Sequence, residues 1–226
     1  MQMIKIENEE IEFRKATIYD NLEEIASLIY DTDPYIYPFW FNNDIEEAKK
    51  FLPNLLRSNN NLFNINNFYI AYDKSSKRII GILCAIDKSI NFDYDYTNDK
   101  SINSHYDFTI NNYVVPIEKE MNDFDENTIY ISNICIDKNY RGKRIGSFLI
   151  GYFISQMERQ GYDKFYLDCL LHNLRAKNLY HCMGFREIKE IVGFDGTNES
   201  KVEVVSFLRK KGAYYPSEFQ VSFLDK

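Results

Sequence analysis

Hydrophobic residues recur along this chain with two different periods, one helical and one strand-like. The first helical period lies in TIYDNLEEIASLIY, where the apolar positions at three- and four-residue spacing are Leu22, Ile25, Ala26 and Ile29. Thr17, with Asp20 three places later, stands where an N-cap is expected. The pattern predicts a helix that is entered from the strand-like run IEFRKA.

A second helix is predicted in NDIEEAKKFL, capped by Asn43 or Asp44 and ended or kinked by Pro53. Two β-rich runs follow, NFYIAYD and RIIGILCAI, and the polar KSSK between them has the length of a hairpin turn. These two runs therefore predict adjacent antiparallel strands.

The run TIYISNICI predicts another strand, but its alternation changes phase around Ser132 and Asn133. A β-bulge gives such a slip, and a central strand that is apolar on both faces explains it equally well. Residues 87–127, which lead into this strand, are polar and rich in Asn, Asp and Tyr. We expect so long a connection to be functional or partly disordered.

Directly after this strand, IGSFLIGYFISQM predicts an amphipathic helix with Gly161 as its C-terminal cap. The apolar face of this helix consists of Ile145, Phe148, Leu149, Tyr152, Phe153 and Met157. The turn before it has two glycines and carries the cations Lys138, Arg141, Lys143 and Arg144, with no acidic residue among them. Such a helix N-terminus attracts phosphate, although an ordinary solvated turn can have the same composition.

Two common phosphate loops do not fit this turn. A Walker A loop has a lysine directly after its last glycine, whereas Gly146 is followed by Ser147 and Phe148. A Rossmann fingerprint has G-x-G-x-x-G, which GKRIG does not supply.

The segment Arg141-Gly142-Lys143-Arg144-Ile145-Gly146 resembles instead the Q/R-x-x-G-x-G/A signature at the acyl-CoA site of the GNAT superfamily of N-acetyltransferases. Arg144 stands where the middle glycine of that signature usually lies. We expect position 144 to be helical already, with a negative φ that tolerates a side chain.

A second, independent segment carries the same resemblance. FYLDCLLHNLRAKNLYHCMGF is similar to the strand that follows in this family and to its pattern N-x-x-A-x-x-x-Y-x-x-x-G-F, with matches at Asn173, Ala176, Tyr180, Gly184 and Phe185. The residues alone predict an Asn-capped helix that ends at a glycine.

The resemblance covers most of residues 11–210 and implies an α/β (α+β) GNAT fold. That fold has a mixed central sheet of about seven strands flanked by helices, with a splay between the fourth and fifth strands. We expect a single acetyltransferase domain over residues 1–226, with an insertion at about 87–127 and a C-terminal tail at about 211–226.

The resemblance also implies an activity, the transfer of an acetyl group from acetyl-CoA to a primary amine by direct attack in a ternary complex. Backbone groups of the turn would hold the pyrophosphate, and those of the preceding strand and Asn173 would bind the pantetheine. The expected cofactor-binding residues are Ile134, Cys135, Ile136, Arg141, Gly142, Lys143, Arg144, Ile145, Gly146, Ser147 and Asn173. Tyr180 would protonate the departing CoA thiolate, or else is a core tyrosine.

The base and the acceptor are less defined by the sequence. Ser132 and Asn133 stand where many relatives carry a carboxylate, so we expect a water chain that ends at Asp125, Glu126 or the insertion. Of the three histidines, His172 is the one placed near the cofactor.

The aromatic run YDTDPYIYPFWF either lines an acceptor pocket or caps the core, and capping is the default. A small-molecule amine and a peptide amine both remain open as substrates.

Composition limits the classes of ligand and the location that we expect for this protein. A net charge of -7 and a pI near 5.1 disfavour nucleic-acid binding. No apolar run approaches the roughly 18 residues of a membrane span, and MQMIKIENEE lacks the pattern of a secretion signal, so we expect a cytoplasmic protein without a membrane partner. The four separated cysteines are expected to be buried thiols, with no metal site.

Two other classes of function remain open. A non-catalytic acyl-CoA sensor with the same fold is the main alternative, and a nucleotide-binding protein that uses the basic turn is a weaker one. The apolar C-terminal tail is able to pack against its own sheet or against a second copy of the chain, so a homodimer remains open as well.

Overall fold

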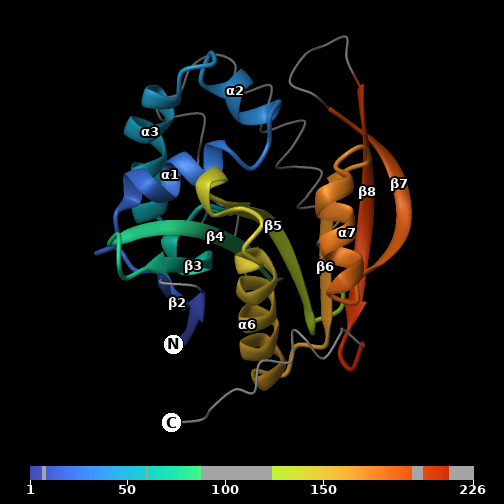
Figure 1. Ribbon diagram of the computed structural model, residues 1–226. Coiled ribbons are helices and arrows are strands. Elements are labelled where there is room, and N and C mark those ends of the chain that lie inside the picture. Colours follow the sequence, from blue (N-terminus) through green and yellow to red (C-terminus); the bar gives the residue numbers. More distant parts are fainter. Residues whose placement is uncertain (7–8, 60, 88–123, 195–200, 214–226) are drawn as a thin grey trace.

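One mixed sheet forms the centre of the protein (Figure 1). The computed structural model describes residues 1–6, 9–59, 61–87, 124–194 and 201–213. In these residues eight strands form the sheet, in the order β1-β2-β3-β4-β5-β6-β8-β7. The strands are β1 (Gln2–Ile6), β2 (Glu9–Lys15), β3 (Phe68–Asp73), β4 (Arg78–Ile86), β5 (Thr128–Ile136), β6 (Lys164–Leu170), β7 (Arg186–Phe194) and β8 (Lys201–Lys210). Strands β5 and β6 are parallel, and the other neighbours are antiparallel.

Helices cover both faces of this sheet. The described helices are α1 (Leu22–Tyr30), α2 (Ile36–Trp40), α3 (Ile45–Arg57), α6 (Ile145–Arg159) and α7 (Leu174–Cys182), with the short 3-10 turns η1 (Ile65–Asn67) and η4 (Lys138–Tyr140). Side chains of α1, α2 and α3 share one buried cluster with the sheet, and those of α6 and α7 share a second one. Figure 1 shows α7 in front of β6 and β8, α6 to the left of these strands, and α1 to α3 in the upper left part of the view.

The expected mixed sheet is confirmed, with one strand more than the seven expected. The additional strand is β1, a short edge strand that pairs with β2 along its whole length. Its alternation is that of a half-buried strand, because Ile4 and Ile6 pack against the cluster under α6 while Met3 is exposed.

Helix α1 begins later than the sequence indicates. Its N-cap is Asn21, whose side chain accepts hydrogen bonds from two backbone N–H groups of the first turn. Thr17 begins a separate turn, in which the carboxylate of Asp20 accepts the Thr17 N–H and pairs with Arg14 at 2.5 Å. The prediction of Thr17 as the cap was wrong because Asp20 closes this turn before the helix starts.

Helix α3 starts as predicted and ends later than predicted. Asp44 is its N-cap and accepts the N–H of Glu46 at 2.8 Å. Pro53 lies inside the helix, which continues to Arg57. Proline removes one helical hydrogen bond, but the residues on both sides of it, Leu52 and Leu55, are completely buried. Burial of about 1.5–3 kcal/mol per leucine offsets that loss.

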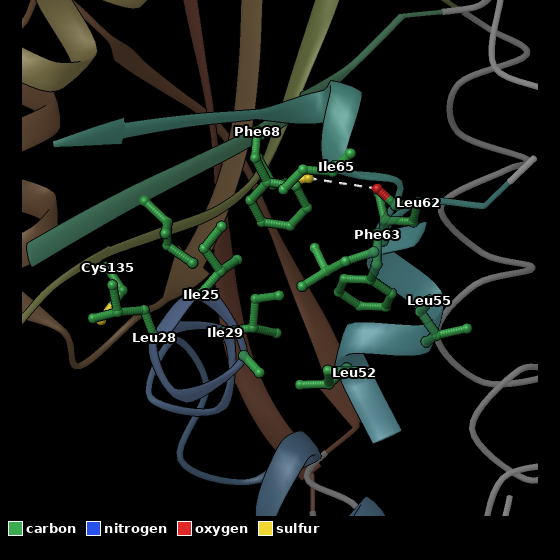
Figure 2. Close-up of a cluster of buried hydrophobic side chains, with 14 of the residues drawn as sticks. Ile25, Leu28, Ile29, Leu52, Leu55, Leu62, Phe63, Ile65, Phe68 and Cys135 are labelled. Carbon is green, nitrogen blue, oxygen red and sulfur yellow. Dashed lines mark hydrogen bonds between the residues drawn. The ribbon is translucent and has the colours of Figure 1, made fainter. Parts of the chain in front are cut away.

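The first core lies between α1, α3 and the sheet (Figure 2). Figure 2 shows Ile25 and Ile29 of α1 directed toward the side chains of α3 and of the strands. All the residues labelled there are at most a few per cent exposed: Ile25, Leu28, Ile29, Leu52, Leu55, Leu62, Phe63, Ile65, Phe68 and Cys135. Because Cys135 belongs to the end of β5, this cluster fixes α1 against the strand end on which the candidate site is built.

The second core confirms the predicted apolar face of α6. Ile145, Leu149 and Phe153 are buried against the sheet, and Phe148 of the same face is half-buried. Gly161, with φ +102°, follows the end of α6, as predicted for a C-terminal cap.

The four cysteines are free thiols. Cys84 and Cys135 are buried as expected, whereas Cys169 is half-buried and Cys182 is exposed at the end of α7, so the expectation of four buried thiols was wrong for these two. Within the described ranges, no His, Cys, Asp and Glu side chains form a group of three that could hold a metal ion. In the same ranges no helix has the length and apolarity to cross a membrane.

Candidate active site

Strands β5 and β6 pair for only part of their length. The parallel pairs run from Thr128↔Lys164 to Ile131↔Leu167, while β5 continues to Ile136. Figure 1 shows the two strands together at the bottom of the view and apart at the top. Residues 132–136 therefore border an opening that β6 does not close. This is the splay expected between the fourth and fifth strands, which become β5 and β6 once β1 is counted.

The backbone of β5 directs hydrogen-bonding groups into this splay. The N–H of Asp137 donates to the carbonyl of Ile80 in β4 at 2.8 Å. Because consecutive residues of an antiparallel strand point their backbone groups to opposite sides, Cys135 faces β4 as Asp137 does. The N–H and C=O groups of Ile134 and Ile136 then face the side on which β6 has already separated.

A β-bulge sets the side chains around the splay. Cys84 of β4 pairs with Asn133, and Ala85 pairs with Ile131, so Ser132 is the extra residue of β5. The bulge that the sequence left open is therefore confirmed. It places the isoleucines on both sides of Ser132 on the α6 face, and it turns Asn133 toward the α1 face.

The turn between β5 and α6 needs two left-handed residues. Gly142 has φ +90° and Arg144 has φ +61°. The expectation that Arg144 is already helical, with a negative φ, was wrong: it is the residue before the helix. A left-handed conformation costs a residue with a side chain roughly 1–2 kcal/mol, so the surrounding turn must hold Arg144 in place.

The N-terminus of α6 is open. Its first intrahelical hydrogen bond runs from the N–H of Phe148 to the carbonyl of Arg144 at 3.2 Å. The N–H groups of Ile145, Gly146 and Ser147 precede that bond, and in the described part of the chain no side chain caps them. A Cβ atom on Gly146 would lie 3.6 Å from both Ile136 and Leu179, which is ordinary contact. The protein itself therefore does not require glycine here.

Cations of the turn are engaged within the protein. Arg141 Nε donates to the carbonyl of Ile136 at 2.8 Å, and Lys143 Nζ lies 2.6 Å from a carboxylate oxygen of Glu9. These contacts favour binding of an anion by the backbone N–H groups rather than by the side chains of the turn.

Helix α7 confirms the second sequence motif. Asn173 is its N-cap, and Asn173 Oδ1 accepts the N–H of Ala176 at 3.2 Å. Gly184, with φ +83°, follows the helix before β7 begins. The acceptor of Asn173 is thus used for capping, which leaves its amide N–H groups as the part that can reach a ligand.

Tyr180 is a buried residue of α7. Its ring packs edge-on against Phe207, with centroids 5.5 Å apart, and against Phe185 at 6.0 Å. Burial, with a smaller contribution from the neighbouring Cys169 thiol, raises the pKa of Tyr180 above its ordinary value. The phenol therefore keeps its proton at neutral pH and is able to donate it. The structure confirms the core interpretation of Tyr180, and its role as an acid stays a prediction.

Asp168 is a further candidate site residue, which the sequence did not indicate. It is the first residue of β6 beyond the last pair with β5, and it shares a sheet face with Tyr166. Tyr130 of β5 donates a hydrogen bond to Asp168 Oδ2 at 3.2 Å. A carboxylate thus lies at the mouth of the splay, on the face opposite Tyr180. The signal was the single acid that interrupts the apolar run FYLDCLL.

The two acids named from the sequence lie away from the splay, and the placement of His172 near the cofactor stays a prediction. Asp125 pairs with Lys164, the first residue of β6, and so lies at the closed end of the β5–β6 pair. Glu126 is exposed beside it, and His172 is exposed before α7. His105 and the rest of the proposed insertion up to residue 123 lie outside the described residues.

The aromatic connection from 30 to 41 caps the core, as the default interpretation held. Tyr37 and Trp40 of α2 are buried in the first core. Asp33 Oδ1 accepts the N–H groups of Tyr35 and Ile36 at 2.7 and 2.8 Å and thereby starts α2. Burial raises the pKa of the Asp33 carboxyl, partly opposed by those two hydrogen bonds.

Solved structures of acetyltransferases have a similar fold. An N-acetyltransferase from Staphylococcus aureus Mu50 has a similar structure, with a TM-score of 0.62 and 16% identity over 87% of this chain and 99% of that chain. A chain in the crystal structure of the NatC complex bound to Gag peptide and CoA is similar with a TM-score of 0.53 and 20% identity over 88% of this chain and 98% of that chain. Identities this low show the fold alone.

The sequence identifies the family. Residues 44–185, more than half of the chain, match the model of the Acetyltransferase (GNAT) family. The chain belongs to this family. N-alpha-acetyltransferase 30 of Dictyostelium discoideum is 37% identical over 62 residues, which are 27% of this chain and 34% of that protein. N-alpha-acetyltransferase 30 of Saccharomyces cerevisiae is 34% identical over 62 residues, or 27% of this chain and 35% of that protein. The chain thus spans about a third of these relatives.

Proposed function

We propose that this protein is an N-acetyltransferase that moves the acetyl group of acetyl-CoA directly to a primary amine while both substrates are bound. The observation that carries the proposal is the splay, where the backbone groups of Ile134 and Ile136 lie beside the open N-terminus of α6. A pantetheine arm needs amide partners along its length, and a pyrophosphate needs N–H donors at its end. The strand and the helix supply these groups in that order.

In this proposal the cofactor is held mainly by the backbone. The N–H groups of Ile145, Gly146 and Ser147 bind the pyrophosphate, and the turn from Arg141 to Arg144 shapes the loop around it. Ile134 and Ile136, on either side of Cys135, bind the pantetheine, and a strand N–H polarises the thioester carbonyl. Asn173 adds its amide N–H groups from the opposite side of the splay.

The acid and the base approach from opposite faces of the sheet. The amine nitrogen attacks the thioester carbonyl carbon, Asp168 accepts the proton that the amine must lose, the C–S bond breaks, and Tyr180 protonates the CoA thiolate. Tyr130 holds the carboxylate of Asp168 through its hydrogen bond.

The α-amine of a peptide is the acceptor class that we propose. The curated relatives are N-alpha-acetyltransferases, and the similar NatC structure is described as bound to a peptide. A carboxylate at the mouth of the splay suits an ammonium group, which Asp168 attracts before it deprotonates it.

A non-catalytic acyl-CoA sensor is the alternative, and one experiment separates it from the enzyme. The melting temperature is measured with acetyl-CoA, CoA, ATP and NAD, since a ligand at about 100 times its dissociation constant adds roughly 2.7 kcal/mol of stability. Thiol release is then followed with short peptides whose N-termini are free or blocked. A shift with both CoA species and thiol release with free peptides only supports the enzyme. A shift without thiol release favours the sensor, and a shift with ATP or NAD alone contradicts both.

A further inference from the structure

A buried polar cluster lies directly beside the bulge of β5. Asn133, which is 4% exposed, points its carboxamide toward the connection between α1 and α2. Its Nδ2 donates to the hydroxyl of Tyr37 at 2.8 Å and to that of Thr32 at 2.9 Å. Tyr37 is completely buried, so this contact lies inside the protein.

The hydrogen bonds fix the orientation of the Asn133 amide. The Thr32 hydroxyl donates its only proton to the carbonyl of Ile29 at 2.6 Å, so toward Asn133 it can only accept. An amide turned by 180° would set its oxygen against that acceptor and lose the bond. Both N–H groups of the side chain are therefore used, and Oδ1 is the atom that remains.

Asn133 Oδ1 is buried, and no hydrogen-bond donor within the described ranges reaches it. A buried carbonyl oxygen without a partner is destabilising, and such atoms in folded proteins call for an explanation. Asn133 lies two residues beyond Ile131, the last β5 residue paired with β6, and it faces the same side of the sheet as Asp168. The unpaired oxygen thus lies on the face of the sheet that carries Asp168, next to the point where β5 and β6 separate.

We propose that Asn133 is a substrate-binding residue, and that Asn133 Oδ1 accepts the hydrogen bond of the first backbone amide N–H of a peptide acceptor. This inference rests on the proposed function. A carboxylate suits the charged α-amine, whereas a neutral carboxamide oxygen suits a neutral amide N–H, which is the next donor along a peptide. Asp168 and Asn133 would then recognise two consecutive nitrogens, and a simple amine would satisfy only one.

The test compares two substrates on two variants of the full chain. The first substrate is the free peptide that wild type acetylates fastest in a panel that varies its first residue, and the second is the same peptide with an ester in place of its first amide. The variants are Tyr37→Phe, which keeps Oδ1 together with the Thr32 acceptor that fixes the amide, and Thr32→Val/Tyr37→Phe/Asn133→Leu, which removes Oδ1. Because the triple variant replaces the whole cluster with apolar groups of similar shape, it leaves no hydroxyl unpaired.

We expect kcat/KM on the ester to be about tenfold below that on the amide for wild type and for Tyr37→Phe, and equal on both substrates for the triple variant. A merely structural Asn133 would change both substrates alike. Equal discrimination by Tyr37→Phe and the triple variant, or none by wild type, overturns the inference while the acetyltransferase stands. No thiol release by wild type with any free peptide overturns the proposed function and the inference with it.

Discussion

Lys143 Nζ lies 2.6 Å from Glu9 Oε1, so the turn at the candidate pyrophosphate site is tied to the start of β2. Both side chains are about one quarter exposed, with values of 26% and 23%. Lys143 also lies over the ring of Tyr140 at 5.3 Å. The charge of this lysine is thus partly balanced by the protein itself, and a bound phosphate would share it with Glu9.

Glu9→Gln is expected to tighten the binding of CoA by about threefold, because it removes a negative charge beside the anion site. Titration calorimetry at low and at high salt measures the effect, which should shrink as salt screens the charge. The control is Glu10→Gln, the exposed neighbour on the same strand. Weaker binding by Glu9→Gln than by Glu10→Gln would mean that the ion pair supports the turn rather than competing with phosphate.

Gly146→Ala is expected to separate folding from cofactor binding. The added Cβ has room within the protein, 3.6 Å from Ile136 and Leu179, and alanine favours a helix over glycine by up to about 1 kcal/mol. The melting temperature should therefore stay constant or rise. A pyrophosphate at the first turn of α6 would meet the new methyl group, so CoA affinity should fall by about tenfold or more.

Gly151→Ala is the matched control, because it makes the same change in the middle of α6, where the nearest atom is Met183 Cε at 3.7 Å. It should raise stability similarly and leave CoA affinity unchanged. If both variants bind CoA as wild type does, the pyrophosphate does not lie at the start of α6.

Tyr180→Phe tests the proposed acid. The ring contacts with Phe185 and Phe207 are retained, so we expect the fold and the affinity for CoA to change little. Turnover should fall by about 100-fold, the usual contribution of a general acid. A thiol-release assay with a free peptide measures turnover, and the affinity for CoA is measured on the same preparation. Unchanged turnover would leave Tyr180 as a core residue only.

The parts of the fold that could be predicted from sequence are those with local causes. Three such features are the apolar face of α6, the glycine at position 161 and the N-cap Asn173. Each depends on residues within one or two helical turns. The phase slip around Ser132 left a bulge and a central strand apolar on both faces equally open, and the pairing with β4 decides for the bulge.

The parts that were missed depend on contacts between distant segments. Asp168 gains its importance from β5, which separates from β6 one residue earlier, and no local pattern reports where two strands part. The left-handed Arg144 follows from how the turn must close between β5 and α6 rather than from its own preference. Asn133, dismissed as a base, became informative only when Thr32 and Tyr37 were found beside it.

Alkaline pH is expected to destabilise the protein through its buried thiols. Burial raises the pKa of Cys84 to about 12, against about 8.5 in the unfolded chain, so its contribution is complete below pH 8.5 and is lost as the pH rises toward 12. Urea unfolding between pH 8 and 11 should show Cys84→Ala with a slope shallower by about 1.4 kcal/mol per pH unit. Cys182→Ala, which changes an exposed thiol, is the control, and equal slopes for both variants would contradict the assignment.

Asp168→Asn is expected to lower kcat for a free peptide by about 100-fold or more, because the amide cannot accept the proton of the amine. The Tyr130 hydroxyl can still donate to the side chain oxygen of asparagine, so the fold and CoA binding should persist. Asp125→Asn is the matched control, since it neutralises a carboxylate at the closed end of the same strand pair. The pH profile decides the role: a base makes wild-type kcat rise with pH, and that rise should vanish in Asp168→Asn but remain in Asp125→Asn. A variant with a lower rate and an unchanged profile would show that Asp168 only positions the amine.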